Sequence, residues 1–283
     1  MNVCYDDPLD LHNTLGSGQA FRWRRENDWY HGVIFDNIVK LRSVPSGIEF
    51  YSAPSDESTI APIIDHYFRI DDNLNEIQHS ISTDEHIAKA IRLYPRMRLL
   101  RQDPWETLIS FISSANSNIP RITKNIEDIS KTLGNTLVLG DHIRSTFPSA
   151  DVLAKAGENI LRELGLGFRA KYIHAVAKII ATGDLDLFAL REMDYNQALE
   201  ALLDLPGVGD KVANCVLLFS LDKMEAFPID VWIDRAIREW YFKEVASLPS
   251  KTALRPWAQQ RFGKYAGYAN HYLFHNRRLQ DKS

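Results

Sequence analysis

Cysteine is nearly absent from this chain of 283 residues, which contains only Cys4 and Cys215. Two cysteines cannot build a four-cysteine iron–sulfur cluster or a structural zinc site, and they provide no disulfide framework. No window approaches the roughly 18–20 uninterrupted apolar residues of a membrane span. The acidic N-terminal segment also argues against a signal peptide. These absences predict an intracellular protein of a reducing compartment, with no contact with a membrane.

Net positive charge is absent as well, since the formal charge is −4 and the pI is near 6.1. This balance by itself argues mildly against nucleic acid as a partner. The distribution of the charges weakens that objection. Residues 94–101 carry three arginines and no acid, and many further lysines and arginines follow residue 100. We therefore expect a local basic face on an acidic protein.

Strand signals dominate the first fifty-odd residues and helix signals dominate the rest. Apolar and aromatic residues cluster or alternate at 18–24, 29–35, 37–42 and 47–51, with turn signals between them, which is typical of an antiparallel meander. A helical period appears at 58–68 and 84–93 and in nearly every segment after 101. The sequence predicts an α+β fold, in which an N-terminal antiparallel β-sheet domain with flanking helices (1–100) packs on a mostly α-helical helix–hairpin–helix domain (101–283).

Helix caps are recognisable in the second part. Asp103 before Pro104 is an N-cap followed by a proline at the first helical position, and it opens a helix through about Ser114. Pro148 and Ser149 start another helix. Further helices are expected at 169–181, 195–203, 210–221, 230–241 and 264–275.

A glycine-bent hairpin stands in the middle of these helices. The letters LPGVGDK place Gly207, Val208 and Gly209 between two apolar helical segments, and Lys211 follows at the start of the second one. Such a rigid tip can present backbone N–H groups to a phosphate without reading base sequence. The five letters LPGVG alone are equally typical of an ordinary corner between two helices.

Lys211 and Asp230 suggest covalent chemistry at a sugar carbon. A lysine amine and a carboxylate at one site can attack and stabilise an oxocarbenium-like centre and can form a Schiff base. Each residue also has a structural interpretation. Most lysines are solvated surface charges, and Asp230 is suited to cap the helix 230–241. An N-capping carboxylate is fixed in place, so that the capping role and the catalytic role are compatible.

The segment from Leu205 to Trp232 resembles the helix–hairpin–helix and Gly/Pro–Asp element of the DNA glycosylase superfamily. More closely, the chain is similar to 8-oxoguanine DNA glycosylases of the eukaryotic type. Blocks at 17–24, 101–123, 164–173 and 265–274 resemble family blocks in the same order and span nearly the whole chain. The resemblance implies an active site in the cleft between the two domains, and base flipping of the target nucleotide. The cysteine count excludes the relatives that hold an iron–sulfur cluster.

The resemblance also implies roles for single residues. Lys211 would attack C1′ and form the Schiff base, and Asp230 would stabilise the positive charge on the sugar. The base pocket would consist of Gly18, Cys215, Asn270 and Phe274. Without the resemblance, Gly18 would be a plain strand-entry glycine and Cys215 a small buried hydrophobic residue.

A second group of residues matches the family positions that contact the opposite strand. Asn116, Arg121 and Arg169 would contact the orphaned cytosine, and Phe168 would wedge into the base stack. A lone arginine would ordinarily be a solvated residue, and Phe168 could belong to the core. Three positions depart from the family, and one of them is Ser117, where the animal enzymes often have a second Asn. Trp232 replaces an expected His, and Asn270 replaces a longer Gln, so the contacts of these positions with the phosphate and the base are open.

Together with the resemblance, these residues predict a bifunctional glycosylase/AP lyase that excises 8-oxoguanine paired with cytosine from double-stranded DNA. It would act as a monomer located with DNA, in the cytoplasm and nucleoid of a prokaryote or in a nucleus. No cofactor is required, although the resemblance allows a cation held by hairpin carbonyls. One alternative is a glycosylase of the same superfamily with another damaged-base preference. The other is a non-catalytic helix–hairpin–helix DNA-binding protein, which would have no use for Lys211 and Asp230 together.

Overall fold

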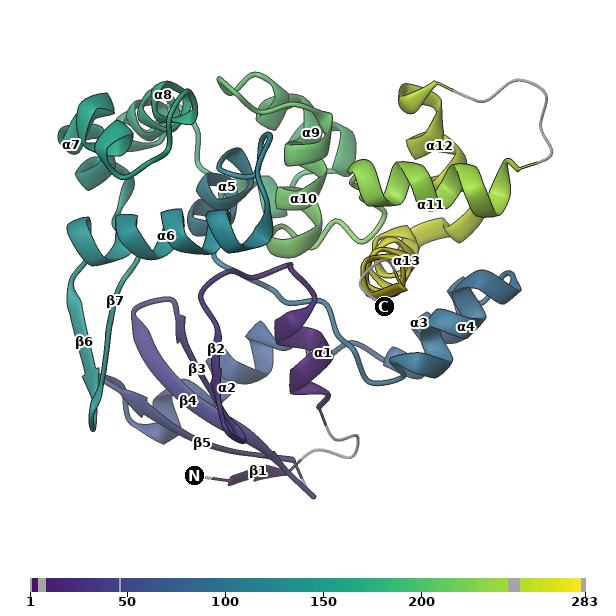
Figure 1. Ribbon diagram of the computed structural model, residues 1–283, viewed down its shortest axis with the longest axis horizontal. Helices are drawn as coiled ribbons and strands as arrows, with labels where there is room; N and C mark the ends of the chain where they lie inside the picture. Colours follow the sequence, from purple (N-terminus) through teal and green to yellow (C-terminus); the bar gives the residue numbers. More distant parts are fainter. Residues whose placement is uncertain (1, 5–8, 46, 244–249, 281–283) are drawn as a thin grey trace.

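The computed structural model describes residues 2–4, 9–45, 47–243 and 250–280 of the chain (Figure 1). The predicted α+β fold is confirmed. An antiparallel sheet comes first, and a mostly helical part lies beside it. The sheet contains β1 (Asn2–Cys4), β2 (Arg24–Glu26), β3 (Trp29–Ile34), β4 (Asn37–Val44) and β5 (Gly47–Ala53), in the spatial order β1-β5-β4-β3-β2.

The prediction of one strand, at residues 18–24, is wrong. Residues 18–24 form bends rather than a strand, and β2 begins only at Arg24. Gly18 has a φ of +88°, which interrupts any extended run. The next residue, Gln19, is buried, and its Nε2 donates to the carbonyls of Thr14 and Arg98, both at 3.0 Å. This segment is therefore fixed by side-chain hydrogen bonds to neighbouring loops instead of by a ladder.

The predicted helices are present with small shifts of their ends, and four more helices occur between them. α1 and α3 were not expected, whereas α6 and α12 lie in the part after residue 101 that was expected to be almost entirely helical, although no bounds were predicted for them. The helices of the described residues are α1 (Leu11–Gly16), α2 (Glu57–Tyr67), α3 (Leu74–Ile81), α4 (Glu85–Leu93), α5 (Pro104–Ile112), α6 (Ile119–Leu133), α7 (Ala150–Glu163), α8 (Arg169–Thr182), α9 (Tyr195–Leu203), α10 (Asp210–Ser220), α11 (Val231–Tyr241), α12 (Lys251–Phe262) and α13 (Ala266–Gln280).

A two-stranded hairpin interrupts the helical part, which was also not expected. β6 (Thr136–Leu139) pairs with β7 (His142–Ser145) in an antiparallel register. Figure 1 shows this hairpin extending from the end of α6 down to the N-terminal sheet. Leu137 contributes to a small apolar cluster with Val33 and Ile38 of the sheet. The hairpin is thus a second connection between the two parts.

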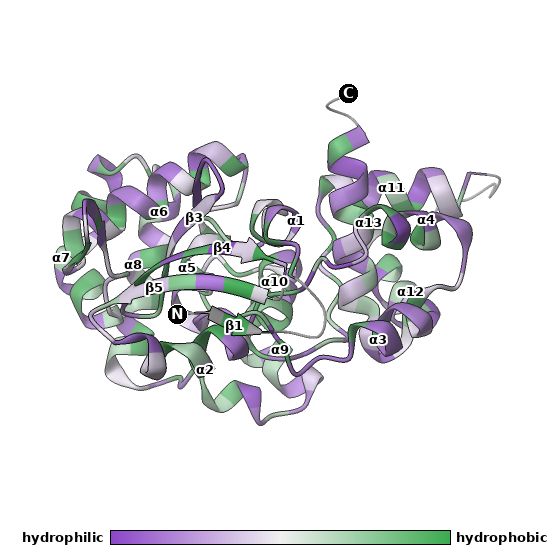
Figure 2. Cartoon of the chain, turned by 90° about the horizontal axis from the view of Figure 1, so that it is seen from below, coloured by the Kyte–Doolittle hydropathy of each residue, from purple (hydrophilic) through white to green (hydrophobic). Residues whose placement is uncertain are grey.

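The sheet and the helices each have a large apolar core. Within the sheet, Leu41 faces Phe50 across β4 and β5, and both pack against Ile60 and Ile64 of α2. Figure 2 shows the corresponding alternation of hydrophobic and hydrophilic residues along β5. A larger apolar core joins α4, α5, α8, α9, α10 and α13. Within the described part of the chain, no helix is both long and apolar enough to span a bilayer.

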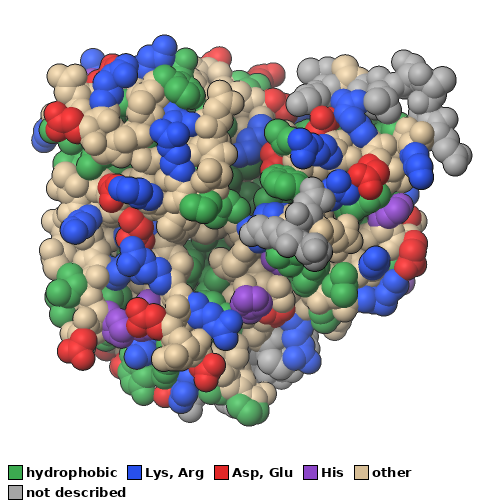
Figure 3. Space-filling view, viewed as in Figure 1, with side chains coloured by type: hydrophobic (Ala, Val, Ile, Leu, Met, Phe, Trp, Pro, Cys, Tyr) green, Lys and Arg blue, Asp and Glu red, His purple; other side chains and the backbone are tan. Residues whose placement is uncertain are grey.

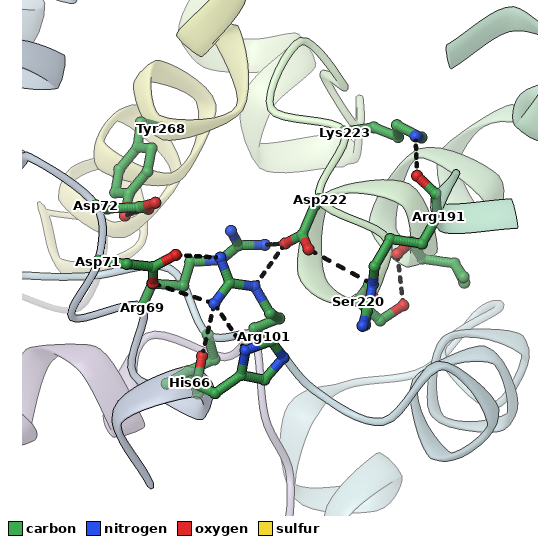
Figure 4. A network of polar contacts seen from close by, with 12 residues as sticks. His66, Arg69, Asp71, Asp72, Arg101, Arg191, Ser220, Asp222, Lys223 and Tyr268 are labelled. Carbon is green, nitrogen blue, oxygen red and sulfur yellow. Dashed lines mark hydrogen bonds and ion pairs between the residues drawn. The ribbon is translucent and has the colours of Figure 1, made fainter. Parts of the chain in front are cut away.

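An ionic network built on two buried arginines joins the two parts next to the helix that carries Lys211. Asp222, in the loop after α10, accepts from Nε of Arg101 at 2.8 Å and forms an ion pair with Arg69 (Figure 4). Arg101 also contacts Asp71, with Nη2 at 3.1 Å from Oδ2. Removing one partner of a buried network costs about 3–5 kcal/mol, because the others lose their counter-charge. The network therefore fixes the loop that runs from α10 toward Asp230.

Candidate active site

A cavity of about 730 Å³ opens between the segment around Gly18 and helices α5, α10, α11 and α13. Figure 3 shows the molecule from the same side as Figure 1, with a hollow between the larger body and the region of α11 and α13. Seven of the predicted site residues line this cavity: Gly18, Asn116, Lys211, Cys215, Asp230, Asn270 and Phe274. The segments that supply them lie far apart in the sequence, so the fold brings the predicted pocket together.

Lys211 lies in the first turn of α10 and points toward the end of α5. Its Nζ donates to Oγ of Ser114 at 2.9 Å and lies 4.8 Å from the ring centroid of Phe111. Ser114 Oγ in turn donates to the carbonyl of Phe111 at 2.6 Å. The interpretation of Lys211 as an ordinary solvated charge is therefore wrong. Its amine is held against one hydroxyl and one aromatic face at the cavity wall.

Asp230 caps α11, as the sequence predicted. Its carboxylate accepts from the backbone N–H of Ile233 at 2.8 Å, which fixes the side chain at the cavity. Burial raises the pKa of the Asp230 carboxyl above its ordinary value, and the N–H of Ile233 and the charge of Lys211 partly oppose that rise. The carboxylate is thus less stabilised than one in water, which increases its attraction for a cation formed nearby.

Cys215 lies one turn after Lys211 on the same face of α10. It is buried, and burial raises the pKa of its thiol to about 11, so that the neutral thiol is the form at neutral pH. Among the described residues Cys215 is a free cysteine. A neutral, polarisable sulfur at a cavity wall is suited to contact with a flat aromatic ring.

Gly18 and Phe274 approach each other at another part of the wall. A Cβ on Gly18 would lie 3.7 Å from Cε1 of Phe274, 3.2 Å from Nη1 of Arg278 and 2.9 Å from Cδ1 of Ile119. Arg278 is itself fixed, because its Nη2 donates to the carbonyl of Gly16 at 2.6 Å. Together with the positive φ, these contacts explain why this position requires glycine.

Asn270 connects the cavity wall to the loop that precedes Asp230. It is buried, and its Nδ2 donates to the carbonyl of Pro228 at 2.9 Å. The shorter amide therefore holds the backbone next to the capping carboxylate. Trp232 and Ser117, the other departures from the family pattern, line the cavity as half-buried side chains.

The residues predicted for the opposite strand lie beside the cavity, and their exposure differs. Asn116 and Arg121 are exposed, Phe168 is 45% exposed, and Asn116 has a φ of +48°. Arg169 is only 2% exposed, so the interpretation of this residue as solvated is wrong. Its guanidinium donates to the carbonyls of Ala115 and Asn116, with Nε 2.7 Å from the former and Nη2 2.9 Å from the latter.

The glycine-bent hairpin lies next to the same edge. Gly207 has a φ of +78°, and a Cβ there would lie 2.5 Å from Cγ of Tyr172 in α8. Val208 is buried beneath the tip, whereas Gly207 and Gly209 are exposed. Gly209 caps α10 without any side-chain hydrogen bond. The first N–H groups of α10 are therefore available to an external acceptor such as a phosphate.

Many residues of the cavity wall were not predicted from the sequence, and Phe111, Ser114 and Arg278 matter most among them because they contact Lys211 or lie against Gly18. Phe111 and Ser114 lie inside a block that resembles the family and Arg278 lies after the last one, but no spacing in the sequence relates these residues to Lys211 or Gly18. Only the contact of α5 with α10 and of α13 with the Gly18 segment gives them a role.

Comparison with known proteins agrees with this geometry. The model of the 8-oxoguanine DNA glycosylase N-terminal domain matches residues 3–108, and that of the HhH-GPD superfamily base excision DNA repair proteins matches residues 109–258. The chain is 34% identical to the N-glycosylase/DNA lyase OGG1 of Arabidopsis thaliana, over 94% of this chain and 76% of the relative. It is 30% identical to a probable N-glycosylase/DNA lyase of Methanothermobacter thermautotrophicus, over 95% of this chain and 94% of that one.

A solved structure shares the whole fold. The 8-oxoguanine glycosylase/lyase of Clostridium acetobutylicum, in complex with double-stranded DNA containing cytosine opposite to 8-oxoguanine, is 34% identical to this chain. It superposes with a TM-score of 0.91 and covers 96% of this chain and 93% of its own. The chain therefore belongs to the 8-oxoguanine DNA glycosylase family of the HhH-GPD superfamily, and it is a DNA N-glycosylase and DNA lyase.

Proposed function

We propose that the chain excises 8-oxoguanine paired with cytosine from duplex DNA through a Schiff base on Lys211, and then nicks the strand. The observation that carries this proposal is the cavity itself. It holds a lysine amine, a half-buried carboxylate and an aromatic ring in one space of about 730 Å³. That volume suits a single flipped nucleotide, since ligand pockets are typically about 300–1,000 Å³.

The reaction follows from the positions of Lys211 and Asp230. The Lys211 amine, held at Ser114 Oγ, adds to C1′ as the bond from C1′ to N9 breaks and its electron pair leaves with the base. Asp230 stabilises the positive charge that develops on the sugar. The bond from C1′ to O4′ then breaks, and O4′ takes a proton from the lysine nitrogen, so that opening of the sugar ring gives the protonated Schiff base. The excised base then accepts a proton from C2′, and the 3′ phosphate leaves by β-elimination. None of these steps uses a cofactor.

Base choice is assigned to the cavity wall. Oxidation at C8 converts N7 of guanine from an acceptor into an N–H donor, so a backbone carbonyl at Gly18 would attract the lesion and face a lone pair of guanine. We place the flipped base between the Phe274 ring and the Cys215 thiol. Because Nδ2 of Asn270 is bonded to Pro228, its Oδ1 is the atom proposed to face the base edge.

DNA binding is assigned to the exposed edge of the cavity. In this proposal Asn116 and Arg121 contact the orphaned cytosine. Arg169 acts indirectly, because its guanidinium donates to the backbone carbonyl of Asn116 and so positions that residue. Phe168 enters the stack as the wedge, and the N–H groups at Gly209 bind a phosphate. All of these groups come from one chain, so we propose that a monomer is sufficient.

Borohydride trapping on an oligonucleotide duplex tests the proposal. With 8-oxoguanine opposite cytosine, we expect a covalent adduct that Lys211→Gln abolishes while far-UV circular dichroism and duplex binding are retained. Lys223 offers a matched control, because its Nζ is bonded to carbonyls away from the cavity. Lys223→Gln is expected to leave trapping intact.

The remaining results would contradict parts of the proposal. If adducts formed only with alkylated or pyrimidine lesions, the substrate would be another damaged base and not 8-oxoguanine. Specific binding without any adduct would instead favour a non-catalytic helix–hairpin–helix protein. An adduct that persists in Lys211→Gln would place the nucleophile on another amine.

A further inference from the structure

Outside the cavity, three side chains with metal-ligating atoms meet where the β6–β7 hairpin reaches the N-terminal sheet. They are Glu26 at the end of β2, His31 in β3 and His142 at the start of β7. One ligand atom of each lies within 4.8 Å of the others. The two imidazole centroids are 3.9 Å apart, and Nε2 of His31 lies 3.7 Å from Oε2 of Glu26.

The backbone fixes this meeting point from two directions. Glu26 pairs with Trp29, and His31 is two residues further along β3, so that the two side chains are diagonal neighbours on one face. Arg144, two residues after His142 in β7, donates to the carbonyl of His31 at 3.3 Å. The hairpin that carries His142 is therefore bonded directly to the strand that carries His31.

The buried imidazole of His31 has unused ligand capacity. His31 is only 4% exposed, and its Nδ1 has no hydrogen-bond partner among the described residues. A buried polar nitrogen without a partner is costly, and a native structure usually compensates such a group.

The other charges near this cluster are held in place by other groups. Lys40 and Arg144 are the nearby cations. The Nζ of Lys40 lies 4.8 Å from the ring centroid of Trp29, and the guanidinium of Arg144 pairs with Glu127. Glu26 is exposed, and its carboxylate can approach the two histidines from the solvent side.

We propose that Glu26, His31 and His142 bind one divalent transition-metal ion of the Zn²⁺ class, with water in the fourth position. Two imidazoles and one carboxylate suit Zn²⁺, Co²⁺ or Ni²⁺, whereas Mg²⁺ and Ca²⁺ prefer sites made of oxygen atoms alone. A tetrahedral ion with bonds of about 2.0–2.2 Å needs ligand atoms roughly 3.4 Å apart. The present spacing reaches that value through small rotations of the side chains.

A bound ion would join β2, β3 and β7, and hence the sheet to the helical part. None of its three ligands lines the cavity with Lys211. The role is therefore structural, and its presence or absence does not depend on the proposed excision mechanism. Because binding to the folded state alone adds stability by mass action, the melting temperature should rise with the concentration of free metal.

The test uses the full chain without an affinity tag, after dialysis against a chelator. Zn²⁺ is titrated in competition with a chromophoric chelator, and Co²⁺ is followed by its visible absorption. We expect one equivalent of Zn²⁺ to bind, an intense tetrahedral Co²⁺ band, a rise in melting temperature, and no response to Mg²⁺. Absence of Zn²⁺ binding at micromolar concentrations would overturn the proposal.

Two ligand variants and one control locate the ion. His142→Gln and Glu26→Gln should each weaken Zn²⁺ binding at least tenfold, and Glu26→Gln changes an exposed side chain that cannot disturb a core. His79→Gln, at an exposed position of α3, should bind like the wild type. Equal affinity in wild type and both ligand variants would place the ion elsewhere and refute the assignment.

Discussion

The cavity wall and the cavity rim are built in different ways. The wall, defined as Gly18, Cys215, Asn270 and Phe274, is largely buried and comes from three separate segments of the chain. The rim, defined as Asn116, Arg121, Phe168, Gly207 and Gly209, is exposed. The wall is completed by contacts within the protein, whereas the rim presents groups whose partners must come from outside.

This difference separates two functions. A preorganised wall can distinguish one base from another, because its donors and acceptors are fixed before the base arrives. An exposed rim with cationic and N–H groups supplies affinity for a polyanion and is weakened by salt. Changes to the wall and its catalytic pair should therefore affect the chemical step, and changes to the rim should affect binding and the choice of opposite base.

The largest effect is expected for Asp230→Asn. Asparagine is also a good N-cap, so the bond to the N–H of Ile233 and the fold should be retained. The negative charge facing the sugar is lost, and single-turnover excision should fall about 10²–10³-fold. Duplex affinity and melting temperature are the accompanying measurements. An unchanged excision rate would remove Asp230 from the mechanism.

A somewhat smaller effect is expected for Gly18→Ala. Alanine is strained on a backbone with a φ of +88°, and its Cβ would also meet Cδ1 of Ile119 at 2.9 Å, so we expect the carbonyl at the wall to shift. A displacement of about 1 Å in a positioned group costs about 100-fold in rate. Single-turnover excision should fall by about that factor, and discrimination between 8-oxoguanine and guanine should narrow.

Gly16→Ala is the matched control for that change. It stands two residues away, and a Cβ there would meet nothing within 4 Å. The control should keep both the excision rate and the base preference. Equal losses in the two variants would mean that the segment responds to stability alone, and the wall carbonyl would lose its assigned role.

The pH dependence of excision tests the electrostatics of the wall. Because burial raises the pKa of Asp230, its carboxylate becomes protonated at a higher pH than an ordinary aspartate does. Excision requires the ionised form, so the rate should fall as the pH falls through that raised pKa, by about tenfold for each unit below it. Single-turnover rates of wild type and Asp230→Asn give the comparison. The fall in excision rate at low pH should be absent in the variant. If the fall persists, it reports the titration of a group other than Asp230.

Local signals in the sequence predicted the features that depend on a few adjacent residues. The caps at Asp230 and Asp103 follow from carboxylates that accept from neighbouring N–H groups, and the bend at Gly207 follows from the positive φ that glycine tolerates. The expected strand at 18–24 failed because Gln19 makes its hydrogen bonds to Arg98 and Leu100, far away in the chain. No periodicity could reveal these contacts.

The same limit applies to the site. The resemblance placed Lys211 and Gly18 in one pocket, but the partners of Lys211 come from α5, and those of Gly18 come from α6 and α13. Burial of Arg169 was also unpredictable, since its acceptors are carbonyls in the distant turn at Ala115. Residues bonded across the fold can be recognised only when the fold is known.

The smallest effects should come from the two arginines proposed for the opposite strand, which differ in burial. Arg121 is exposed, and Arg121→Ala should lower the preference for cytosine a few-fold with little change in melting temperature, as is usual for surface positions. Arg169 lies at the rim but is buried like the wall. In Arg169→Ala the carbonyls of Ala115 and Asn116 lose their donors, so stability should fall by about 1–3 kcal/mol.

Excision opposite each of the four bases, together with thermal unfolding, separates the two positions. We expect Arg169→Ala to lower the preference for cytosine and the melting temperature together, because the turn that presents Asn116 is released. Arg169→Lys should restore part of the stability but less of the preference, since one ammonium group cannot reproduce the fork between two carbonyls. If Arg121→Ala destabilised the chain as much as Arg169→Ala, the proposed difference between an exposed and a buried arginine at the rim would be refuted. If the wild type acted equally on all four pairs, the assignment of these residues to the opposite cytosine would be refuted.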